Sequence, residues 1–414
     1  MNGHCRRRDT CRLCGGKDLR PVLELTPTPP ANAFVGETGL DSEQPCFPLD
    51  VFFCRGCGHV QLLDVVDPGL LFEDYVYVSG TSPVFIEHFE RYADDVTRRF
   101  APEPGSLVVD IGSNDGTLLA AFKSRGLKVL GVDPARDIAA RATDGGIETI
   151  TGFFTPELAA KILQNYAPAA VVTANNVFAH ADDLAGIVQG VRTLLAPGGV
   201  FVFEASYLAD VVEKTLFDTI YHEHLAYHSV KPLTRFFREN GMRLFAAERV
   251  SSHGGSIRGM VEAEGGPHQA DGSVEALIGL EEELGLDRAE TFSDFAARID
   301  GLGDDLKKLT SDIKAEGKSI AGFGAPAKAT TLMYHFGLGP ETVDFIVDDS
   351  PLKQGLYTPG HHIPVLPTAE LYVRRPDYAL ILAWNFAQPI MDKHSAFREA
   401  GGRFIVPLPT LETH

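Results

Sequence analysis

The sequence predicts an α/β protein in which a small cysteine-rich N-terminal unit precedes two Rossmann-like units. Three observations support this prediction. All six cysteines lie before residue 60. Apolar, strand-like runs alternate with helix-length stretches in two series, one from about residue 106 to 264 and one from residue 319 onward. Each series opens with a glycine-rich turn between a strand and a helix. The expected boundaries are 1–75, 76–267 and 268–414, because 414 residues are too many for one ordinary core.

The cysteines of the first unit form two CxxC motifs, "CRLC" and "CRGC", with 39 residues between them. Paired CxxC motifs bring four thiolates within tetrahedral reach of one zinc ion. The expected zinc ligands are Cys11, Cys14, Cys54 and Cys57. A four-thiolate site has no open position, so this Zn²⁺ would be structural; disulfides or free thiols are the alternative. Cys5 and Cys46 lack a CxxC partner, and we expect no role for them.

Charge and hydropathy exclude several classes of partner. Lys and Arg number 37 against 56 Asp and Glu, which gives a net charge of −19. Without a basic stripe, such a chain is a poor nucleic-acid binder, because phosphate contacts need concentrated positive charge. No apolar run reaches the roughly 18 residues of a membrane span, and no signal peptide is evident. We therefore expect a cytoplasmic protein, with a monomer favoured.

The second and third units have the strand pattern of parallel sheets with crossover helices. After a helix near 83–100, the buried-strand runs are "SLVVDIG", "LKVLGVDP", "AAVVTANNV" and "GGVFVFEAS", with "MRLFAAERV" and "SIRGMVEAE" as two further strands. The charge-rich stretch from about 268 to 316 is expected to be helical. A second series follows in "SIAGFGAPAKATTLMYHFG", "VDFIVDDS", "YALILAWN" and "RFIVPLP".

The first glycine turn, "VVDIGSNDGTLL", is a candidate cofactor site. Gly112 and Gly116 let the backbone approach a ligand, and Asp133 ends the next strand, where it can accept hydrogen bonds from a ribose diol. Asp110 stands directly before the turn. A carboxylate there repels a pyrophosphate but suits a cationic ammonium group, which indicates S-adenosylmethionine rather than NAD.

The second glycine turn, "AGFGAPAKAT", has no acidic residue in the corresponding position. Gly322, Gly324 and the small Ala327 are followed by Lys328 in the next helix, so this turn suits phosphate from a dinucleotide or a sugar nucleotide. Close packing of helix on strand without any ligand is the alternative. A true NAD site here would make the chain a methyltransferase fused to an oxidoreductase.

Taken together, the motifs resemble one family. The order of the double CxxC unit, "YVYVSGTS", "DIGSNDGTLL", "GVDPA", "NNVFAH", "LLAPGG", "YHEH", "SHGGSIR" and "GFGAPAKA" is similar to that of the sugar C-methyltransferases of antibiotic deoxysugar biosynthesis. The resemblance runs from about Cys11 to the C-terminus. It implies an S-adenosylmethionine-dependent enzyme with a class I methyltransferase domain, acting on a nucleotide-linked 4-keto-6-deoxyhexose. Asn114, where many methyltransferases have glycine, fits the "SNDG" version of this family.

The resemblance places the stretch "TIYHEHLAYHSV", residues 219–230, on the sugar side of the active site. Tyr221, Glu223 and His224 would face the sugar, with His180 on the opposite wall. A 4-keto group makes the neighbouring C3–H or C5–H acidic enough for an imidazole to remove, and a donor such as Tyr221 or a second histidine can stabilise the enolate oxygen.

Two other interpretations of this stretch remain open. One is a metal site formed by His222, His224 and His228, and the other is a set of structural histidines. His222 is expected to project away from Tyr221 and Glu223 in an extended segment, and it is left out of the catalytic set.

The remaining site residues are expected at strand ends and tight turns. The expected cofactor contacts are Asp110, Gly112, Ser113, Asn114, Gly116, Asp133, Pro134, Phe153, Asn175 and Asn176. The expected substrate contacts are Tyr75, Tyr77, Ser79, His253, Arg258, Gly324 and Lys328. Core packing is the alternative for Phe153, aromatic packing of the zinc unit for the 75–79 stretch, and a structural carboxylate for Arg258.

Overall fold

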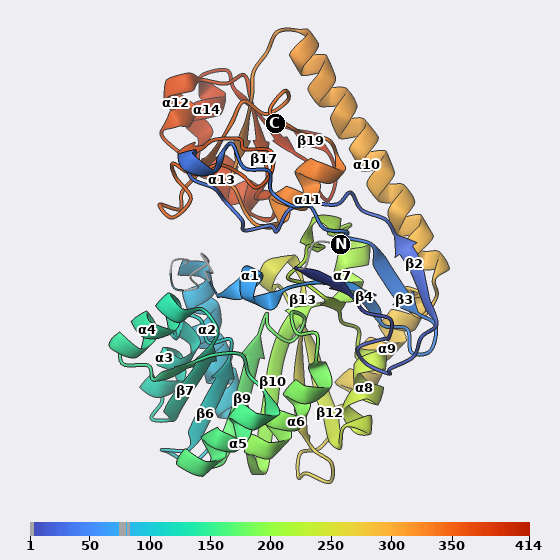
Figure 1. The fold of residues 1–414 in the computed structure, drawn as a ribbon, viewed down its shortest axis with the longest axis vertical. Helices are drawn as coiled ribbons and strands as arrows, with labels where there is room; N and C mark the ends of the chain where they lie inside the picture. Colours follow the sequence, from blue (N-terminus) through green and yellow to red (C-terminus); the bar gives the residue numbers. More distant parts are fainter. Residues whose placement is uncertain (1–3, 74–79, 81–82) are drawn as a thin grey trace.

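The computed structural model describes residues 4–73, 80 and 83–414, and it confirms the α/β class (Figure 1). The strands form sheets of two, four, seven and six strands. Tyr75, Tyr77 and Ser79 lie outside the described residues, as does the side chain of His253. No helix in the described part of the chain is long and apolar enough to cross a membrane.

The N-terminal unit consists of two small antiparallel sheets. Its elements are β1 (Cys5–Arg7), β2 (Leu19–Leu23), η1 (Glu37–Gly39), β3 (Val51–Cys54), β4 (Val60–Leu62), β5 (Asp64–Val66) and α1 (Pro68–Phe72). Strands β1 and β5 pair with each other, and the second sheet has the order β11-β4-β3-β2. Strand β11 (Ala226–Tyr227) follows the YHEH stretch directly, so the N-terminal unit shares a sheet with the candidate active-site segment.

A long loop of the N-terminal unit, residues 26–50, packs on the C-terminal domain, and we call it the arm (Figure 1). The backbone of Val35 pairs with Tyr357, and the Gly360 N–H donates to Gln44 Oε1 at 2.6 Å. Thr330 Oγ1 donates to the carbonyl of Ala31 at 3.2 Å. The proline-rich stretch expected to belong to a small separate unit is therefore a bridge between two parts of the protein.

The middle unit is a seven-stranded sheet with helices on both faces. Its elements are α2 (Pro83–Phe100), β6 (Leu107–Ile111), α3 (Thr117–Ser124), β7 (Lys128–Asp133), α4 (Arg136–Asp144), β8 (Thr149–Thr151), α5 (Pro156–Asn165), β9 (Ala169–Asn175), α6 (Leu184–Leu194), β10 (Leu195–Ser206), α7 (Leu208–Glu213), η3 (Phe217–Thr219), α8 (Val230–Glu239), β12 (Met242–Val250), η4 (Ser252–Gly254) and β13 (Ser256–Ala263). The order is β12-β13-β10-β9-β6-β7-β8, with β13 antiparallel to both neighbours and the other pairings parallel.

Burial explains why these strands have near-continuous apolar sequences. All five residues of β6 are buried, and β10 is buried from Val200 to Ala205, because helices cover both faces of the sheet. Phe178, Phe201 and Phe203 pack against one another with ring centroids 5.1–5.8 Å apart. This aromatic core supports the loop after β9, where His180 lies.

The C-terminal unit has a six-stranded sheet of order β16-β15-β14-β17-β18-β19, parallel except for the last pair. Its elements are α9 (Ser273–Glu283), α10 (Glu290–Ala315), β14 (Ile320–Phe323), α11 (Lys328–His335), β15 (Phe345–Asp348), β16 (Val365–Pro367), α12 (Glu370–Arg374), β17 (Tyr378–Ile381), η5 (Trp384–Phe386), α13 (Ala387–Lys393), α14 (Ser395–Glu399), β18 (Arg403–Val406) and β19 (Glu412–Thr413). Helix α9 packs on α8 and β12, and the long helix α10 contacts β2 of the N-terminal unit (Figure 1).

Each Rossmann-like sheet has a switch point, where later strands of the chain lie on both sides of its first strand. Strand β6 has β7 on one side and β9 on the other, and β14 has β15 and β17. Ligands of open α/β sheets bind at the carboxyl ends of strands at such switch points. Both glycine turns follow these two central strands, so both lie where the fold offers a ligand site.

Candidate active site

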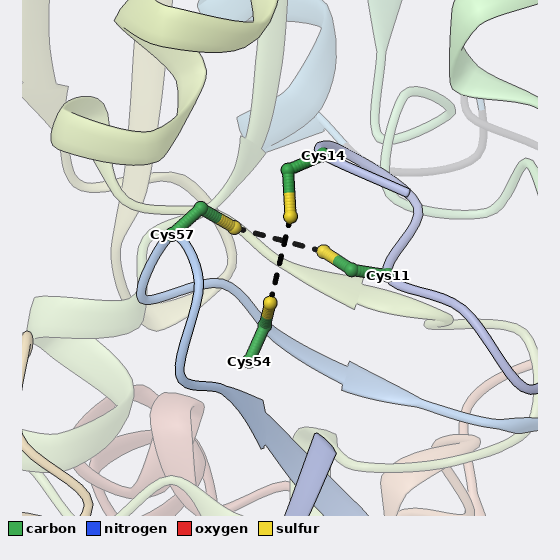
Figure 2. Close-up of side chains that lie close together, drawn as sticks. All are labelled: Cys11, Cys14, Cys54 and Cys57. Carbon is green, nitrogen blue, oxygen red and sulfur yellow. Dashed lines mark hydrogen bonds between the residues drawn. The ribbon is translucent and has the colours of Figure 1, made fainter. Parts of the chain in front are cut away.

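The two CxxC motifs bring their four sulfur atoms together, so that all four point toward one centre (Figure 2). Cys11 Sγ lies 3.6 Å from Cys57 Sγ, Cys14 Sγ lies 3.6 Å from Cys54 Sγ, and all four sulfurs lie within 4.8 Å of one another. Tetrahedral Zn–S bonds of about 2.3 Å place sulfurs about 3.8 Å apart, whereas a disulfide needs about 2.05 Å. The donor set and its spacing therefore fit a structural zinc ion, and no disulfide joins any of the six cysteines.

The four-cysteine cluster is a candidate metal site, because its ligand atoms lie close together. Among the described residues it is the one group of three or more His, Cys, Asp or Glu side chains with ligand atoms close enough for a metal ion. His222, His224 and His228 form no such group, so the metal interpretation of residues 219–230 is wrong. Cys5 and Cys46 lie outside the cluster, as expected.

The first glycine turn has a backbone that admits glycine or asparagine. Gly112 and Gly116 have φ values of +69° and +79°. A Cβ at Gly112 would overlap Val177, and one at Gly116 would lie 2.9 Å from Ile147. Asn114 lies between them with φ +51°, a conformation that asparagine tolerates better than most residues. Because the turn is tight and has no bulky side chain at Gly112 or Gly116, a cofactor at the carboxyl end of β6 can approach the backbone.

Two buried carboxylates flank this turn. Asp133 accepts hydrogen bonds from the N–H groups of Asn114 at 2.8 Å and Ala135 at 2.9 Å, so its side chain is held in place at the end of β7. Asp110 accepts a hydrogen bond from Thr173 Oγ1 at 2.6 Å. Burial raises the pKa of Asp110 to about 7, against the effect of the Thr173 hydrogen bond. A cationic group beside Asp110 would restore its charged form.

The other expected cofactor contacts surround the same strand ends. Asn175 ends β9, and Asn176 follows with φ +55° while its N–H donates to the carbonyl of Glu204 at 2.8 Å. Ser113 Oγ is buried and has no hydrogen-bond partner among the described residues. Pro134 is half-buried, and Phe153 is exposed on the loop after β8 rather than packed in the core. The turn, the two carboxylates and the unpaired hydroxyl fit S-adenosylmethionine.

The YHEH stretch is a turn after η3, so the expected extended conformation is wrong. The N–H of His224 donates to the carbonyl of Tyr221 at 2.8 Å, which closes the turn. His222 still faces away from the site: it is buried against the N-terminal unit, where Nε2 donates to the carbonyl of Phe47 at 3.1 Å. Burial lowers the pKa of His222 to about 4, so this side chain is a neutral structural histidine.

One hydrogen bond selects the tautomer of His224. Its Nδ1 lies 2.7 Å from the carbonyl oxygen of Thr219, and a carbonyl oxygen can only accept, so Nδ1 carries the proton. In the neutral ring the lone pair is then on Nε2. The Tyr221 ring lies 4.1 Å from the His224 ring, centroid to centroid, and the His180 ring lies 4.9 Å away. The structure thus brings Tyr221, His180 and His224 together.

Backbone pairing explains why His180, 44 residues earlier, lies beside His224. The N–H groups of Leu225 and Ala226 both donate to the carbonyl of Ala179, at 2.9 and 3.1 Å. The loop after β9 is therefore bonded directly to the end of the YHEH turn. The ring of Phe72 stacks on the other side of His180 at 5.7 Å.

Glu223 receives a partner that sequence reasoning did not find. Asn32, on the arm, donates from Nδ2 to Glu223 Oε1 at 2.7 Å, and Glu223 is buried. Asn32 lies in "TPPANAF", a stretch with turn composition and no catalytic motif. Only the path of the arm across the protein brings it to the site, so no local signal could have identified it.

The second glycine turn also has the geometry of a ligand site. Gly324 has φ +83°, and a Cβ there would lie 2.7 Å from the Cβ of Ala383. Lys328 Nζ donates to Asn385 Oδ1 at 2.8 Å and lies 3.5 Å from the centroid of the Trp384 ring. Burial lowers the pKa of Lys328 to about 8. A hollow beside this turn is lined by Phe34 of the arm and by Ala325, Pro326, Ala329 and Met333.

Arg258 is bound to structural carboxylates. Its guanidinium donates from Nε to Glu204 Oε1 at 2.7 Å and from Nη1 to Glu248 Oε1 at 2.9 Å, and it lies 4.4 Å from the centroid of the Tyr92 ring. His88 Nε2 lies 2.9 Å from the second oxygen of Glu204. Arg258 therefore pairs with structural carboxylates, which was the alternative to a substrate contact. We do not retain it as a substrate contact.

Comparison with known proteins agrees with this architecture. Family models match residues 11–72 ("Putative zinc binding domain"), 85–247 ("Methyltransferase domain") and 251–409 ("C-methyltransferase C-terminal domain"). The C-methyltransferase NovU of Streptomyces niveus is 37% identical over 401 residues, which cover 97% of this chain and 96% of NovU. The chain belongs to the C-methyltransferase family.

More distant matches cover less than half of this chain. The ubiquinone biosynthesis O-methyltransferase of Burkholderia pseudomallei is 29% identical over 36% of this chain and 70% of its own. The crystal structure of magnesium protoporphyrin IX methyltransferase from Synechocystis PCC 6803 is 15% identical, with a TM-score of 0.33 over 44% of this chain and 82% of its own. This C-methyltransferase uses S-adenosylmethionine.

Proposed function

We propose that this C-methyltransferase transfers a methyl group from S-adenosylmethionine to C3 or C5 of a nucleotide-linked 4-keto-6-deoxyhexose, with His224 as the general base. The observation that best supports this is the bond from His224 Nδ1 to the Thr219 carbonyl. It puts the proton of the neutral ring on Nδ1 and makes Nε2 the basic nitrogen, which is the tautomer that proton abstraction through Nε2 needs. Resemblance to deoxysugar enzymes supports the substrate class.

The chain's own residues account for the proton transfer. The C–H bond beside the ketone breaks, its proton moves to Nε2 of His224, and its electron pair forms an enolate whose oxygen needs a hydrogen-bond donor. Tyr221 and His180, whose rings lie beside that of His224, are the proposed donors. S-adenosylmethionine, when bound, supplies an electrophilic methyl that the enolate carbon attacks, and neutral S-adenosylhomocysteine leaves.

The nucleotide part of the substrate is proposed to bind at the second glycine turn. Lys328 is a cation at the start of α11, and the turn at Gly324 follows the central strand β14, the place where ligands bind in such sheets. The family model that matches residues 251–409 is that of a C-methyltransferase C-terminal domain, which favours this function over an NAD(P)-dependent oxidoreductase domain.

Deuterium exchange tests the proposal without methyl transfer. The ketosugar nucleotide is incubated in D₂O with S-adenosylhomocysteine, and deuterium entry beside the carbonyl is followed by NMR. Wild type is expected to exchange one carbon-bound hydrogen, at C3 or C5, and His224→Ala to lose about 10²–10⁴ in rate. Tyr221→Phe keeps the ring and should lose less.

Cofactor binding by the same variants is measured by thermal shift with S-adenosylhomocysteine, since a ligand of the native state stabilises it. His224→Ala should keep this shift. Exchange by His224→Ala at the wild-type rate would overturn the assignment of the base, and His180→Ala would be examined next.

A further inference from the structure

We infer that the C-terminal domain positions the general base: α11 and Trp384 hold the η3 turn that orients His224, so Thr331 and Asp218 are positioning residues for the reaction. This inference rests on the proposed function of His224. It assigns the C-terminal domain a part in proton transfer as well as in substrate binding.

Two consecutive carbonyl groups carry the first step of the argument. The carbonyl of Thr219 accepts the hydrogen bond from His224 Nδ1, and the next carbonyl, that of Ile220, accepts one from Thr331 Oγ1, both at 2.7 Å. Thr331 and Ile220 are almost completely buried, at 0% and 2% exposure. Without Thr331 the Ile220 carbonyl would lose its partner in a place that water does not reach. The Ile220 backbone that sets the direction of the Thr219 carbonyl is therefore fixed by a side chain of α11.

A second contact holds the start of the same turn. Asp218, fully buried, accepts a hydrogen bond from Trp384 Nε1 at 2.5 Å, and the Lys328 ammonium lies 3.5 Å from the centroid of that indole ring. The ring of Phe217 lies 4.9 Å from that of Phe336. Phe217 therefore packs on the C-terminal domain, Asp218 and Ile220 are hydrogen-bonded to it, and Thr219 lies between them.

The contacts connect the second glycine turn to the turn that carries His224. Helix α11 begins at Lys328, directly after the second glycine turn, and Trp384 lies under the Lys328 ammonium. A ligand that orders this turn orders α11 and Trp384 with it, and these are the elements that hold η3. The base is then best aligned when the C-terminal domain is correctly packed, although that domain supplies no proton acceptor of its own.

The matched pair Thr331→Val and Thr331→Ser tests the inference. Valine has the shape of threonine without the hydroxyl donor, whereas serine keeps the donor. We expect Thr331→Val to lower the maximal exchange rate in D₂O on the order of 5- to 50-fold, with little change in KM, and Thr331→Ser to stay near wild type.

The pH profile separates positioning from a merely structural role. A carbonyl acceptor at Nδ1 favours the imidazolium form of His224, so loosening that bond should move the acid limb of the exchange profile to lower pH in Thr331→Val and not in Thr331→Ser. The other titratable groups beside the ring, Tyr221, His180 and Glu223, are unchanged in both variants. If Thr331→Val only lowers the melting temperature, with wild-type rate and profile for the folded enzyme, the inference is wrong.

His224→Ala, measured in parallel, distinguishes this inference from the proposed function. If His224→Ala exchanges like wild type, the proposed function fails and the inference fails with it. If His224→Ala is inactive and Thr331→Val behaves like wild type, only the inference fails. The double variant should be no slower than His224→Ala, because Thr331 acts through His224. Should Thr331→Val not fold, Trp384→Phe, which removes the donor to Asp218, is expected to give the same loss of rate and shift of profile, and wild-type behaviour would overturn the inference.

Discussion

Asn32 donates a hydrogen bond to Glu223 across 191 residues of sequence, with Nδ2 and Oε1 2.7 Å apart. Glu223 is 2% exposed, and a carboxylate so far from water is costly unless it is hydrogen-bonded. The arm that carries Asn32 starts and ends in the zinc unit and packs on the C-terminal domain. The candidate active site is therefore completed by residues of three parts of the chain, and the zinc unit has a direct connection to it.

Replacing Asn32 should lower turnover without unfolding the protein. Asn32→Ala removes one donor to Glu223, and the expected loss in kcat is about 10-fold, because an unpaired buried acceptor costs roughly 1–3 kcal/mol. Asn32→Asp places a second carboxylate against Glu223 and should cost more. The measurement is kcat and KM for methyl transfer, with the melting temperature recorded for each variant.

Gln44→Ala is a control on the same arm, since Gln44 bonds Ala33 and Gly360 and no residue of the YHEH turn. Its effect should appear in stability rather than in kcat. If both Asn32 variants had wild-type turnover, the role of Glu223 in turnover would not depend on its hydrogen bond to Asn32.

Loss of zinc should impair the active site as well as the N-terminal unit. Cys54→Ser breaks the four-thiolate shell, and structural zinc sites contribute directly to folding free energy. Strand β4 follows Cys57 and pairs with β11 beside the YHEH turn, so disorder there reaches His224. We expect Cys54→Ser to bind less than one zinc per chain, to melt at a lower temperature and to lose activity.

Cys46→Ser is the matched control, because Cys46 is exposed and lies outside the cluster. It should retain one zinc ion by atomic absorption and wild-type activity. A Cys54→Ser protein, or a chelated wild type, that is free of metal yet fully folded and active would contradict the structural role.

The sequence predicted the features that depend on neighbouring residues, and it missed those that depend on contacts between residues far apart in the chain. Both glycine turns were predictable because Gly112 and Gly324 have left-handed φ values that their neighbours require. The YHEH turn was not, because its conformation is imposed by the β11–β4 pairing and by contacts from Thr331, far away in the sequence. Arg258 shows the same limit, since its register opposite Glu204 in the sheet decides its partner.

The protonation state of Asp110 gives a prediction about cofactor binding. Burial raises the pKa of Asp110 to about 7 from the ordinary value of 3.8; the nearby charge of Asp133 adds to this, and the Thr173 hydrogen bond opposes it. Between about pH 4 and pH 7 the folded protein without cofactor holds a proton here that the unfolded chain has released. The contribution of Asp110 to the free energy of unfolding therefore falls as pH rises through this window.

If the cofactor's ammonium group lies beside Asp110, it favours the carboxylate, so binding must release that proton below about pH 7. The affinity for S-adenosylhomocysteine, which has the same ammonium group, should then rise as pH increases from 6 toward 7.5. Calorimetric titrations in buffers of different ionisation enthalpy measure both the affinity and the proton released. Asp110→Asn, which cannot ionise, should remove the pH dependence. Asp133→Asn should weaken binding at every pH, because Asp133 is assigned to the ribose. It should keep a pH dependence whose midpoint lies at lower pH, because the Asp133 charge that raises the pKa of Asp110 is gone. An affinity that does not change with pH in the wild type, or a dependence that survives in Asp110→Asn, would place the ammonium group elsewhere.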